Sequence, residues 1–374
     1  MKYSFVIPTY NKKEPLKRTL KALNNLSGYT WENYEVVVVD DGSSEEVFEF
    51  IKGVNLNYRL NYVYLERCED SCRARTRNYG IQVARGQYIV FIDDDIVVNS
   101  DYLEELDRYY RVSDNLVVNG LRLHCPSGLI DGTDIRELRR TACRDANTDV
   151  LEVRHMICNH LSYNLSAHKY PWLLTFTSNL AVPRKLLLEI EGFDENFKKW
   201  GGEDVELAYR LLKAGGKLVI NNKIEAFHQA HPVAPQGENN LAYLVEKCKE
   251  VFKDIQPDTL FALFNMELCF GDPDLWSTFR AYPGKLTRKW KVELCDESEL
   301  ESVKKKISVL SKKKGNEIIV IDYCESTDLD IWVQMLDVKN AVISYFPQSL
   351  RISNQKILQL MKEVLFENAN LSFR

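Results

Sequence analysis

The segment Tyr-Ile-Val-Phe-Ile-Asp-Asp-Asp, residues 88–95, joins five apolar residues directly to three acidic ones. A short apolar run rich in β-branched and aromatic residues predicts a buried strand. Residues 3–7 and 35–39 repeat this pattern, and a further strand is expected at residues 62–65. These runs make a β-sheet the centre of the predicted fold.

Helical patterns separate the predicted strands. Apolar residues recur at helical spacing in residues 14–26 and 73–84, which predicts helices there. Buried strands that alternate with helices favour a mostly parallel sheet with helices on both faces, as in Rossmann-like proteins. The expected fold class is therefore α/β.

Polar residues mark the ends of these strands. Ligands of open α/β sheets bind beyond the carboxyl ends of the strands. The polar residues at those ends are Thr9, Tyr10, Asn11, Asp40, Asp41, Asp93, Asp94 and Asp95. We therefore expect a binding site at one edge of the sheet.

The regular pattern weakens after residue 121. Residues 121–170 are expected to form a long, partly irregular connection. Strands are predicted at 175–182 and 217–221, and helices at 183–191 and between the glycine pairs 201–202 and 215–216. Residues 232–240, rich in Pro, Gly and Asn, indicate a domain boundary or a loop.

This boundary predicts an α/β domain at residues 1–235 and an accessory region of unknown role at residues 241–374. The accessory region begins with a helical pattern at 241–255 and continues as a small α/β unit. Its predicted helices are 297–313, 329–336 and 354–366, and its predicted strands are 318–321 and 341–345.

Composition narrows the class of protein. Hydrophobic residues make up 45% and charged residues 28% of the 374 residues, as in soluble globular proteins. A net charge of −5 gives no reason to expect nucleic acid as a partner. The nine cysteines are irregularly spaced, and the sequence shows neither a signal peptide nor a long apolar stretch. These features predict a cytoplasmic protein, and contact with the inner face of a membrane is compatible with them.

The acidic triplet Asp93-Asp94-Asp95 indicates a cation site. Adjacent carboxylates repel one another, so a strand end holds them ionised only with a compensating charge. A divalent ion with oxygen ligands and bound phosphates provides it. An isolated acidic triplet is more often a solvated turn, but the buried strand before it and the other polar strand ends favour a metal site.

Residues 200–204, Trp-Gly-Gly-Glu-Asp, form a second candidate group. The glycines permit close approach of the backbone to a ligand. Glu203 and Asp204 are expected in the first turn of a helix, where the dipole keeps carboxylates ionised, as a general base requires. A lone histidine such as His228 is usually structural or solvent-facing, although neutral imidazole binds metals that accept nitrogen. His228 becomes a candidate only through the resemblance described next.

Together these segments resemble the GT-A fold of family 2 glycosyltransferases. The matching segments are, in order, Val6-Ile7-Pro8-Thr9-Tyr10-Asn11, Val39-Asp40-Asp41-Gly42-Ser43, Arg77-Asn78-Tyr79-Gly80, Phe91-Ile92-Asp93-Asp94-Asp95, Gly192-Phe193-Asp194-Glu195, Trp200-Gly201-Gly202-Glu203-Asp204 and Phe227-His228-Gln229. The later segments look like those of bacterial chondroitin polymerases, β-1,4-galactosyltransferases and polypeptide N-acetylgalactosaminyltransferases. The similarity covers residues 1–235, although residues 121–170 match none of the motifs.

The resemblance implies a role for each matching residue. The implied nucleotide-binding residues are Pro8, Thr9, Tyr10, Asp41, Arg77, Asn78, Asp93 and Asp94, with Asp41 accepting a hydrogen bond from uracil. Asp95 of the DxD motif and His228 would hold Mn²⁺ or Mg²⁺. Asp204 would be the catalytic base, and Glu203 would orient the acceptor. Trp200, Gly201 and Gly202 would contact the donor sugar or the acceptor.

The implied function is metal-dependent transfer of a sugar from a UDP-sugar to a saccharide, glycolipid or peptide acceptor. Retaining relatives carry Asn at the position of Asp204, which favours inversion. Two alternatives stay open, a sugar-nucleotide-binding or scaffold protein without catalysis and a nucleotidyltransferase. The complete set of Asp93, Asp95, Asp204 and His228 disfavours the first, and the absence of glycine from residues 8–15 disfavours the second.

Three other groups have simpler explanations. A zinc site is suggested by His124, Cys125, Cys143, His155, Cys158 and His160, but their spacing does not form paired ligands. The lysines at 304–306 and 312–314 are expected on a solvated helix face, although anionic lipid would be attracted to them. Stacking on sugars is one interpretation of Trp276, Phe279, Tyr282 and Trp290, but core packing or an interdomain seam is the simpler one. The C-terminal region leaves homo-oligomer formation open.

Overall fold

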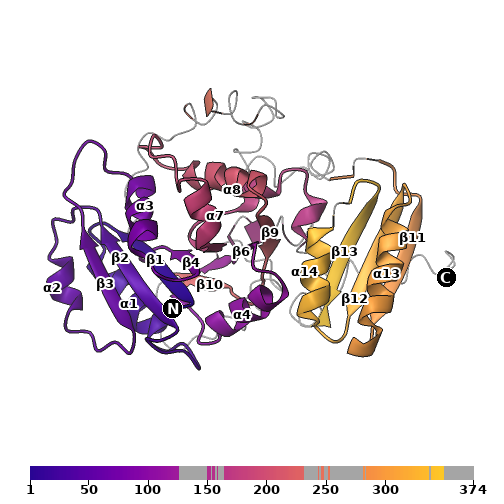
Figure 1. Ribbon diagram of the computed structural model, residues 1–374, viewed down its shortest axis with the longest axis horizontal. Helices are drawn as coiled ribbons and strands as arrows, with labels where there is room; N and C mark the ends of the chain where they lie inside the picture. Colours follow the sequence, from indigo (N-terminus) through magenta and orange to yellow (C-terminus); the bar gives the residue numbers. More distant parts are fainter. Residues whose placement is uncertain are drawn as a thin grey trace. The chain divides into compact units, whose positions relative to one another are not determined.

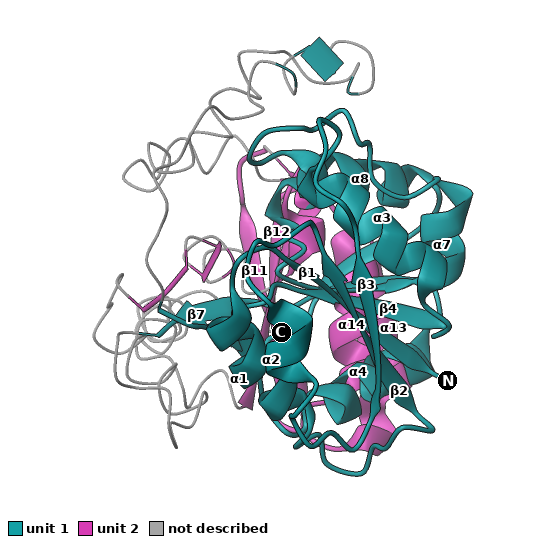
Figure 2. Ribbon diagram, turned by 90° about the vertical axis from the view of Figure 1, so that its left-hand side faces the viewer, with its two compact units in different colours: residues 1–130, 172–266 teal, residues 131–171, 267–374 magenta. Residues whose placement is uncertain are grey.

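The computed structural model describes residues 1–125, 164–230 and 281–348 apart from 283 and 337, together with scattered residues between 150 and 158 and between 243 and 252. The chain divides into two compact units, which are described separately (Figure 2). The first comprises residues 1–130 and 172–266, and the second comprises residues 131–171 and 267–374. The boundary expected at residues 232–240 lies outside the described residues.

A seven-stranded sheet forms the centre of the first unit, in the order β3-β2-β1-β4-β8-β6-β9. Its strands are β1 (Tyr3–Thr9), β2 (Tyr34–Asp40), β3 (Arg59–Tyr64), β4 (Tyr88–Ile92), β6 (Leu116–Asn119), β8 (Asn179–Pro183) and β9 (Lys217–Ile220). The strands β1 to β4 run parallel, and β8 is antiparallel to β4 and β6. The expected mostly parallel sheet is confirmed.

Helices lie on both faces of this sheet. They are α1 (Lys13–Leu23), α2 (Val47–Ile51), α3 (Arg73–Val83), α4 (Tyr102–Val112), α7 (Arg184–Glu189) and α8 (Glu203–Lys213). Figure 1 shows α3, α7 and α8 on one side of the sheet and α1 and α4 on the other. The α1 helix illustrates why they pack, because Leu16, Leu20 and Leu23 form one apolar stripe and are fully buried.

A second, three-stranded sheet of the first unit brings distant segments together. Its strands are β5 (Ile96–Val98), β7 (Arg122–His124) and β10 (Ala226–His228). The central strand β10 runs antiparallel to β5 and parallel to β7. Because β5 directly follows the acidic triplet, this sheet places β10 beside it.

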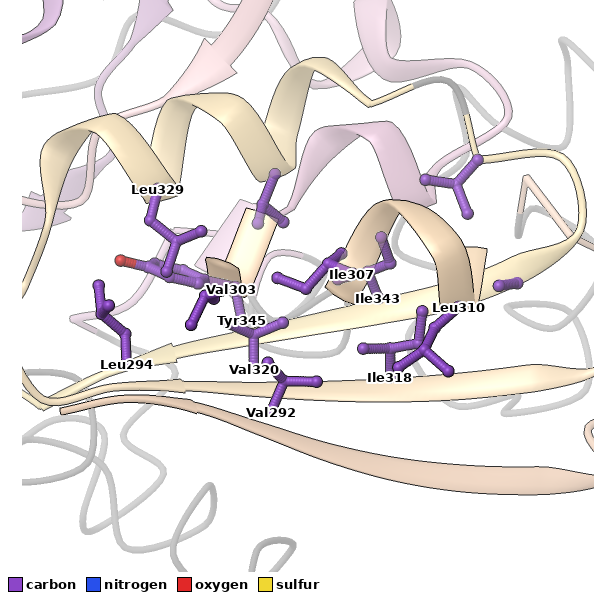
Figure 3. Close-up of a cluster of buried hydrophobic side chains, with 13 residues drawn as sticks. Val292, Leu294, Val303, Ile307, Leu310, Ile318, Val320, Leu329, Ile343 and Tyr345 are labelled. Atoms are coloured by element: carbon purple, nitrogen blue, oxygen red, sulfur yellow. The ribbon is translucent and has the colours of Figure 1, made fainter. Parts of the chain in front are cut away.

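The second unit contains a parallel sheet of three strands in the order β11-β12-β13. The strands are β11 (Arg288–Leu294), β12 (Asn316–Asp322) and β13 (Ala341–Pro347), and the helices are α13 (Leu300–Ser311) and α14 (Thr327–Met335). Short 3₁₀ helices of the chain lie at Leu165–Ala167 (η1), Pro171–Leu174 (η2) and Glu297–Glu299 (η3). Figure 3 shows the apolar core, where Ile307 of α13, Ile318 of β12 and Ile343 of β13 belong to one buried cluster.

Several elements differ from the sequence predictions. The third strand begins at Arg59 rather than at residue 62, because it is an edge strand whose side chains are only partly buried. The alternating segment Arg288–Leu294 forms a strand that the sequence analysis left unassigned. The helix expected at 354–366 and most of the one expected at 241–255 lie outside the described residues. Within the described ranges, no helix has the length and apolar character needed to cross a bilayer.

Candidate active site

The carboxyl ends of β1, β2 and β4 bring polar side chains to one edge of the sheet. Thr9 Oγ1 at the end of β1 donates a hydrogen bond of 2.8 Å to Oδ2 of Asp94 after β4. The backbone N–H of Asp41, after β2, donates to the carbonyl oxygen of Thr9 at 3.0 Å. Pro8 lies opposite Val39 in the β1–β2 register. The expected gathering of strand ends is therefore present.

His228 lies beside the acidic triplet. It is opposite Ile96 in the β5–β10 pair, and its Nε2 atom is 3.7 Å from Oδ1 of Asp95. Burial lowers the pKa of His228 to about 4, although the Asp95 carboxylate opposes this shift. The imidazole is consequently neutral at neutral pH and retains a nitrogen lone pair.

These two groups have the chemistry of metal ligands. Asp95 is 2% exposed, and its gap to His228 exceeds the length of a normal hydrogen bond. Mn²⁺ accepts carboxylate oxygen together with imidazole nitrogen, and a nucleotide diphosphate would add oxygen ligands. Among the described residues, no group of three or more His, Cys, Asp or Glu side chains could hold a metal by itself. The donor pair thus fits an ion that is shared with a bound diphosphate.

Gln229 fixes the strand that carries His228. Its fully buried side chain donates from Nε2 to the carbonyl oxygen of Pro15 and to Thr19 Oγ1, both at 3.1 Å. Its Oε1 accepts from Arg18 Nε at 2.6 Å, and its backbone N–H donates to the carbonyl oxygen of Asp95 at 2.9 Å. The strand end, the acidic triplet and α1 are thus joined by one residue, which reaches α1 through its side chain and Asp95 through its backbone.

Lys12 supplies positive charge to the acidic triplet. Its Nζ lies 2.7 Å from Asp95 Oδ2 and 3.3 Å from Asp94 Oδ1. Burial raises the pKa of Asp94 to about 7, against the opposing effect of Lys12. Sequence analysis did not single out Lys12, although it lies three residues beyond the end of β1 and β1 is the neighbour of β4.

Arg77 joins the acidic triplet to the start of α8. Its guanidinium is 3.1 Å from Glu203 Oε1 through one terminal nitrogen and 3.2 Å from Asp93 Oδ1 through the other. Burial opposes ionisation of Asp93, but Arg77 and other nearby cations outweigh it and lower the pKa of this carboxyl. The structure gives Arg77 two carboxylate partners, and its expected contact with the nucleotide stays a prediction.

Asn78 holds the loop that begins at Gly192. Its amide accepts from the N–H of Phe193 at 2.8 Å and donates to Phe193 O at 2.9 Å and Glu195 Oε1 at 2.8 Å. A Cβ atom on Gly192 would lie 2.4 Å from Asn78 Oδ1, so glycine is required there. The structure places Asn78 at this loop, and its expected contact with the nucleotide stays a prediction.

The start of α8 presents Asp204. Gly201 and Gly202 have φ angles of 83° and 91°, which favour glycine. Trp200, just before them, is 51% exposed. Sequence analysis expected the helix dipole to keep Asp204 ionised, but burial and the neighbouring Glu203 raise its pKa to about 7. A carboxyl with this pKa is suited to accept a proton near neutral pH.

Tyr10, Asp41 and Arg67 lie together beyond β1 and β2. The guanidinium carbon of Arg67 is 4.1 Å from the centre of the Tyr10 ring. One of its terminal nitrogens donates to Asp41 Oδ2 at 2.6 Å, and burial raises the pKa of Asp41. Asp41 is 6% exposed, whereas Tyr10 is 45% exposed. Arg67 was not recognised from the sequence, because its position depends on the path of the chain after β3.

The described members of the suggested zinc set form no group of three or more side chains that could hold a metal. His124 stacks edge-on against His228 with ring centres 5.3 Å apart, while Cys143 and His160 lie outside the described residues. Trp290 packs against the core of the second unit, as expected. Trp276 and Phe279 also lie outside the described residues.

Two family models match successive parts of the chain. Residues 4–161 match glycosyl transferase family 2, and residues 154–232 match the N-terminal domain of galactosyltransferase. Together these two matches span residues 4–232, which include the seven-stranded sheet apart from Tyr3 and every residue of the site above. The second match is consistent with the expected likeness of the later motifs to galactosyltransferases.

Individual relatives agree with the family matches. The glycosyltransferase YfnE of Bacillus subtilis (strain 168) is 27% identical over 67% of this chain and 71% of its own length. Chondroitin synthase of Escherichia coli is 28% identical over 61% of this chain, and the match spans only 35% of that enzyme. The solved mannosyltransferase PcManGT of Pyrobaculum calidifontis, in complex with GDP-Man and Mn²⁺, has a TM-score of 0.50 at 17% identity, over 74% of this chain and 71% of that one. This last likeness concerns the fold.

Proposed function

Since this chain is a glycosyltransferase of family 2, we propose that it transfers a sugar from a UDP-sugar to a hydroxyl group of a saccharide, glycolipid or peptide, with inversion and with Mn²⁺ or Mg²⁺. The observation that carries this proposal is the convergence of Asp95, His228 and the start of α8 on one edge of the sheet. The His228–Asp95 separation of 3.7 Å supports a shared ion, and Arg77 links that edge to Glu203.

Asp95 and His228 would hold the metal. When bound, the ion would supply Lewis-acid stabilisation of the negative charge on the departing diphosphate. PcManGT was solved with GDP-Man and Mn²⁺, which supports a divalent ion in a protein of this fold. The neutral state of His228 favours the same role, because a protonated imidazole cannot be a ligand.

Tyr10 and Asp41 would bind the base of the donor. The exposed ring of Tyr10 offers a face for stacking, and the buried carboxylate of Asp41 would accept a hydrogen bond from the base N–H. A carboxylate acceptor favours uracil over cytosine, whose corresponding ring nitrogen carries no hydrogen. The choice of UDP rests on this pairing.

Asp204 would act as the general base. Its carboxylate accepts the proton of the acceptor hydroxyl while that oxygen forms a bond to the anomeric carbon of the sugar. The bond from that carbon to the diphosphate oxygen breaks on the opposite face, so the configuration inverts and UDP leaves. The pKa of about 7 matches this task at neutral pH. Arg77 would keep the neighbouring Glu203 in place, and Glu203 would orient the acceptor.

A donor screen tests this function directly. The chain is incubated with UDP-, GDP- and CDP-sugars in the presence of Mn²⁺, and release of the nucleotide is measured with and without candidate acceptors. We expect release from a UDP-sugar that stops on chelation of the metal and is lost in Asp95→Ala. Binding of a UDP-sugar without any release or transfer would instead favour a sugar-nucleotide-binding protein without catalysis.

A further inference from the structure

Arg67 makes two contacts in the proposed base pocket. Its guanidinium is stacked over Tyr10, with 4.1 Å from the guanidinium carbon to the ring centre. The same group donates to Asp41, at 2.6 Å to Oδ2 and at 3.2 Å to the backbone carbonyl oxygen. The planar guanidinium of Arg67 therefore already covers one face of the Tyr10 ring and one carboxylate oxygen of Asp41.

The backbone holds Arg67 close to this pocket while its side chain stays accessible. The N–H of Leu65 donates to the carbonyl oxygen of Asp40 at 2.8 Å, which guides the chain across the end of β2. Gly42 has a φ angle of 77°, and a Cβ atom there would lie 2.7 Å from the backbone nitrogen of Arg67. The Arg67 side chain is nevertheless 47% exposed, so its guanidinium can move into solvent.

The contacts of Arg67 duplicate those of a uracil ring. The uracil of a nucleotide is planar, stacks on aromatic rings and presents one ring N–H. Guanidinium is also planar, stacks on aromatic rings and carries only donors. The same ring face and the same carboxylate oxygen cannot serve both groups at once. Arg75, at 3.6 Å from Asp41 Oδ1, keeps a positive charge near the carboxylate when Arg67 leaves.

We propose that Arg67 occupies the position of the donor base in the nucleotide-free protein and must swing away before the donor binds. Arg67 is thereby a residue that sets donor affinity, and it competes most directly with bases that present a ring N–H to Asp41. This inference rests on the proposed function, because it takes Tyr10 and Asp41 as the base pocket.

Uridine binding tests the competition. The affinities of the parent 374-residue chain and of its variant Arg67→Met for uridine and for UDP are measured by titration calorimetry. Uridine is the decisive probe, because it has no phosphate whose attraction to Arg67 would hide the effect. The half-exposed guanidinium of Arg67 makes one stacking contact and one partly exposed ion pair, which together predict about five- to tenfold tighter uridine binding by Arg67→Met. Arg59→Met, an exposed position at the start of β3, is expected to bind like the parent.

The outcomes separate this inference from the function on which it rests. If the parent binds UDP and Arg67→Met binds uridine equally or more weakly, Arg67 does not compete and only this inference is overturned. If neither protein binds uridine or UDP, with or without Mn²⁺, the base pocket and the proposed donor are both wrong. Only one outcome supports competition between Arg67 and the donor base, namely tighter uridine binding by Arg67→Met than by the parent.

Discussion

Nε2 of His228 lies 3.7 Å from Oδ1 of Asp95, across the pair of strands β5 and β10. The two residues are distant in sequence, and they meet because β10 is hydrogen-bonded to the strand that follows the acidic triplet. The backbone bond from Gln229 to Asp95 fixes the same arrangement. This relationship allows the proposed metal site to be tested one side chain at a time.

Removal of either proposed ligand is expected to weaken metal-dependent donor binding. Loss of a residue that only hydrogen-bonds to a metal ligand lowers metal affinity by about 10- to 100-fold. Asp95→Ala and His228→Ala remove the proposed ligands themselves, so each should lower the metal-dependent affinity for UDP by at least this factor. The measurement is calorimetric titration with UDP, with and without Mn²⁺. Asp114→Ala is the control, because this exposed carboxylate pairs with Lys185 away from the strand ends. Unchanged Mn²⁺ dependence in His228→Ala would show that His228 is not a ligand.

Asp204→Asn is expected to keep UDP binding but to lose transfer by about 100-fold or more, because the amide cannot accept the proton of the acceptor. In the parent, Asp204 becomes protonated as the pH falls through about 7. The value of kcat/KM should therefore fall about tenfold per pH unit below that point. The residual activity of Asp204→Asn should lack this slope. A parent profile that is flat from neutral pH to about pH 5 would contradict the assignment of the base.

Arg77→Ala is expected to lower the free energy of unfolding by about 3–5 kcal/mol, because it leaves the buried Glu203 without its cation. Chemical denaturation measures this loss. Adding Glu203→Gln should recover part of it, with a coupling energy of about 0.5–3 kcal/mol. If the effects of Arg77→Ala and Glu203→Gln on the free energy of unfolding were purely additive, the two residues would not be coupled. Lys185→Ala, which breaks the exposed pair with Asp114, should change stability by no more than about 0.5 kcal/mol.

Lys12→Met is expected to raise the affinity for Mn²⁺ in the absence of nucleotide. The ammonium of Lys12 is 2.7 Å from Asp95 Oδ2, so a divalent ion at Asp95 must displace or repel it. The affinity can be followed by electron paramagnetic resonance of free Mn²⁺. Lys13→Met is a matched control, because Lys13 lies over the Phe50 ring instead. Weaker Mn²⁺ binding by Lys12→Met would show that Lys12 assists the ion rather than competing with it.

Gly201→Ala is expected to destabilise the protein by about 1–2 kcal/mol through backbone conformation alone. Gly201 has a φ angle of 83°, and a Cβ atom there would meet nothing within 4 Å. Gly53→Ala provides the comparison, since that site is equally open and lacks a positive φ angle. Thermal unfolding of both variants measures the difference. Equal midpoints would show that the turn before α8 relaxes without strain.

The central strands could be predicted from the sequence because burial on both faces leaves a continuous apolar run. All seven residues of β2 are buried, and its expected range of 35–39 lies within Tyr34–Asp40. Edge strands lack this signal. In β11 the residues Lys289, Lys291 and Glu293 alternate with inward side chains, so no apolar run marks it. The reversed direction of β8 also has no local signal, because it depends on the connections before and after the strand.

The proximity of the candidate site residues could be predicted where it depends on strand ends and motif order, as for Asp94, Asp95 and His228. It could not be predicted where a side chain is oriented by tertiary contacts. Arg77 was assigned from its motif, but its direction depends on how α3 packs against the start of α8. The raised pKa of Asp204 likewise depends on burial, which the sequence of a helix terminus does not reveal.

The place of β8 in the sheet has a consequence for how the protein is made on the ribosome. When residues 1–125 have emerged, β4 and β6 both exist, but the strand that lies between them is still to be translated. Each strand then presents an edge of unpaired backbone N–H and C=O groups, which can pair with the strands of other chains. At about 5–20 residues per second the missing strand follows several seconds later. The nascent chain therefore passes through a period of aggregation risk, during which a chaperone would raise the yield of active enzyme and slow elongation would lower it.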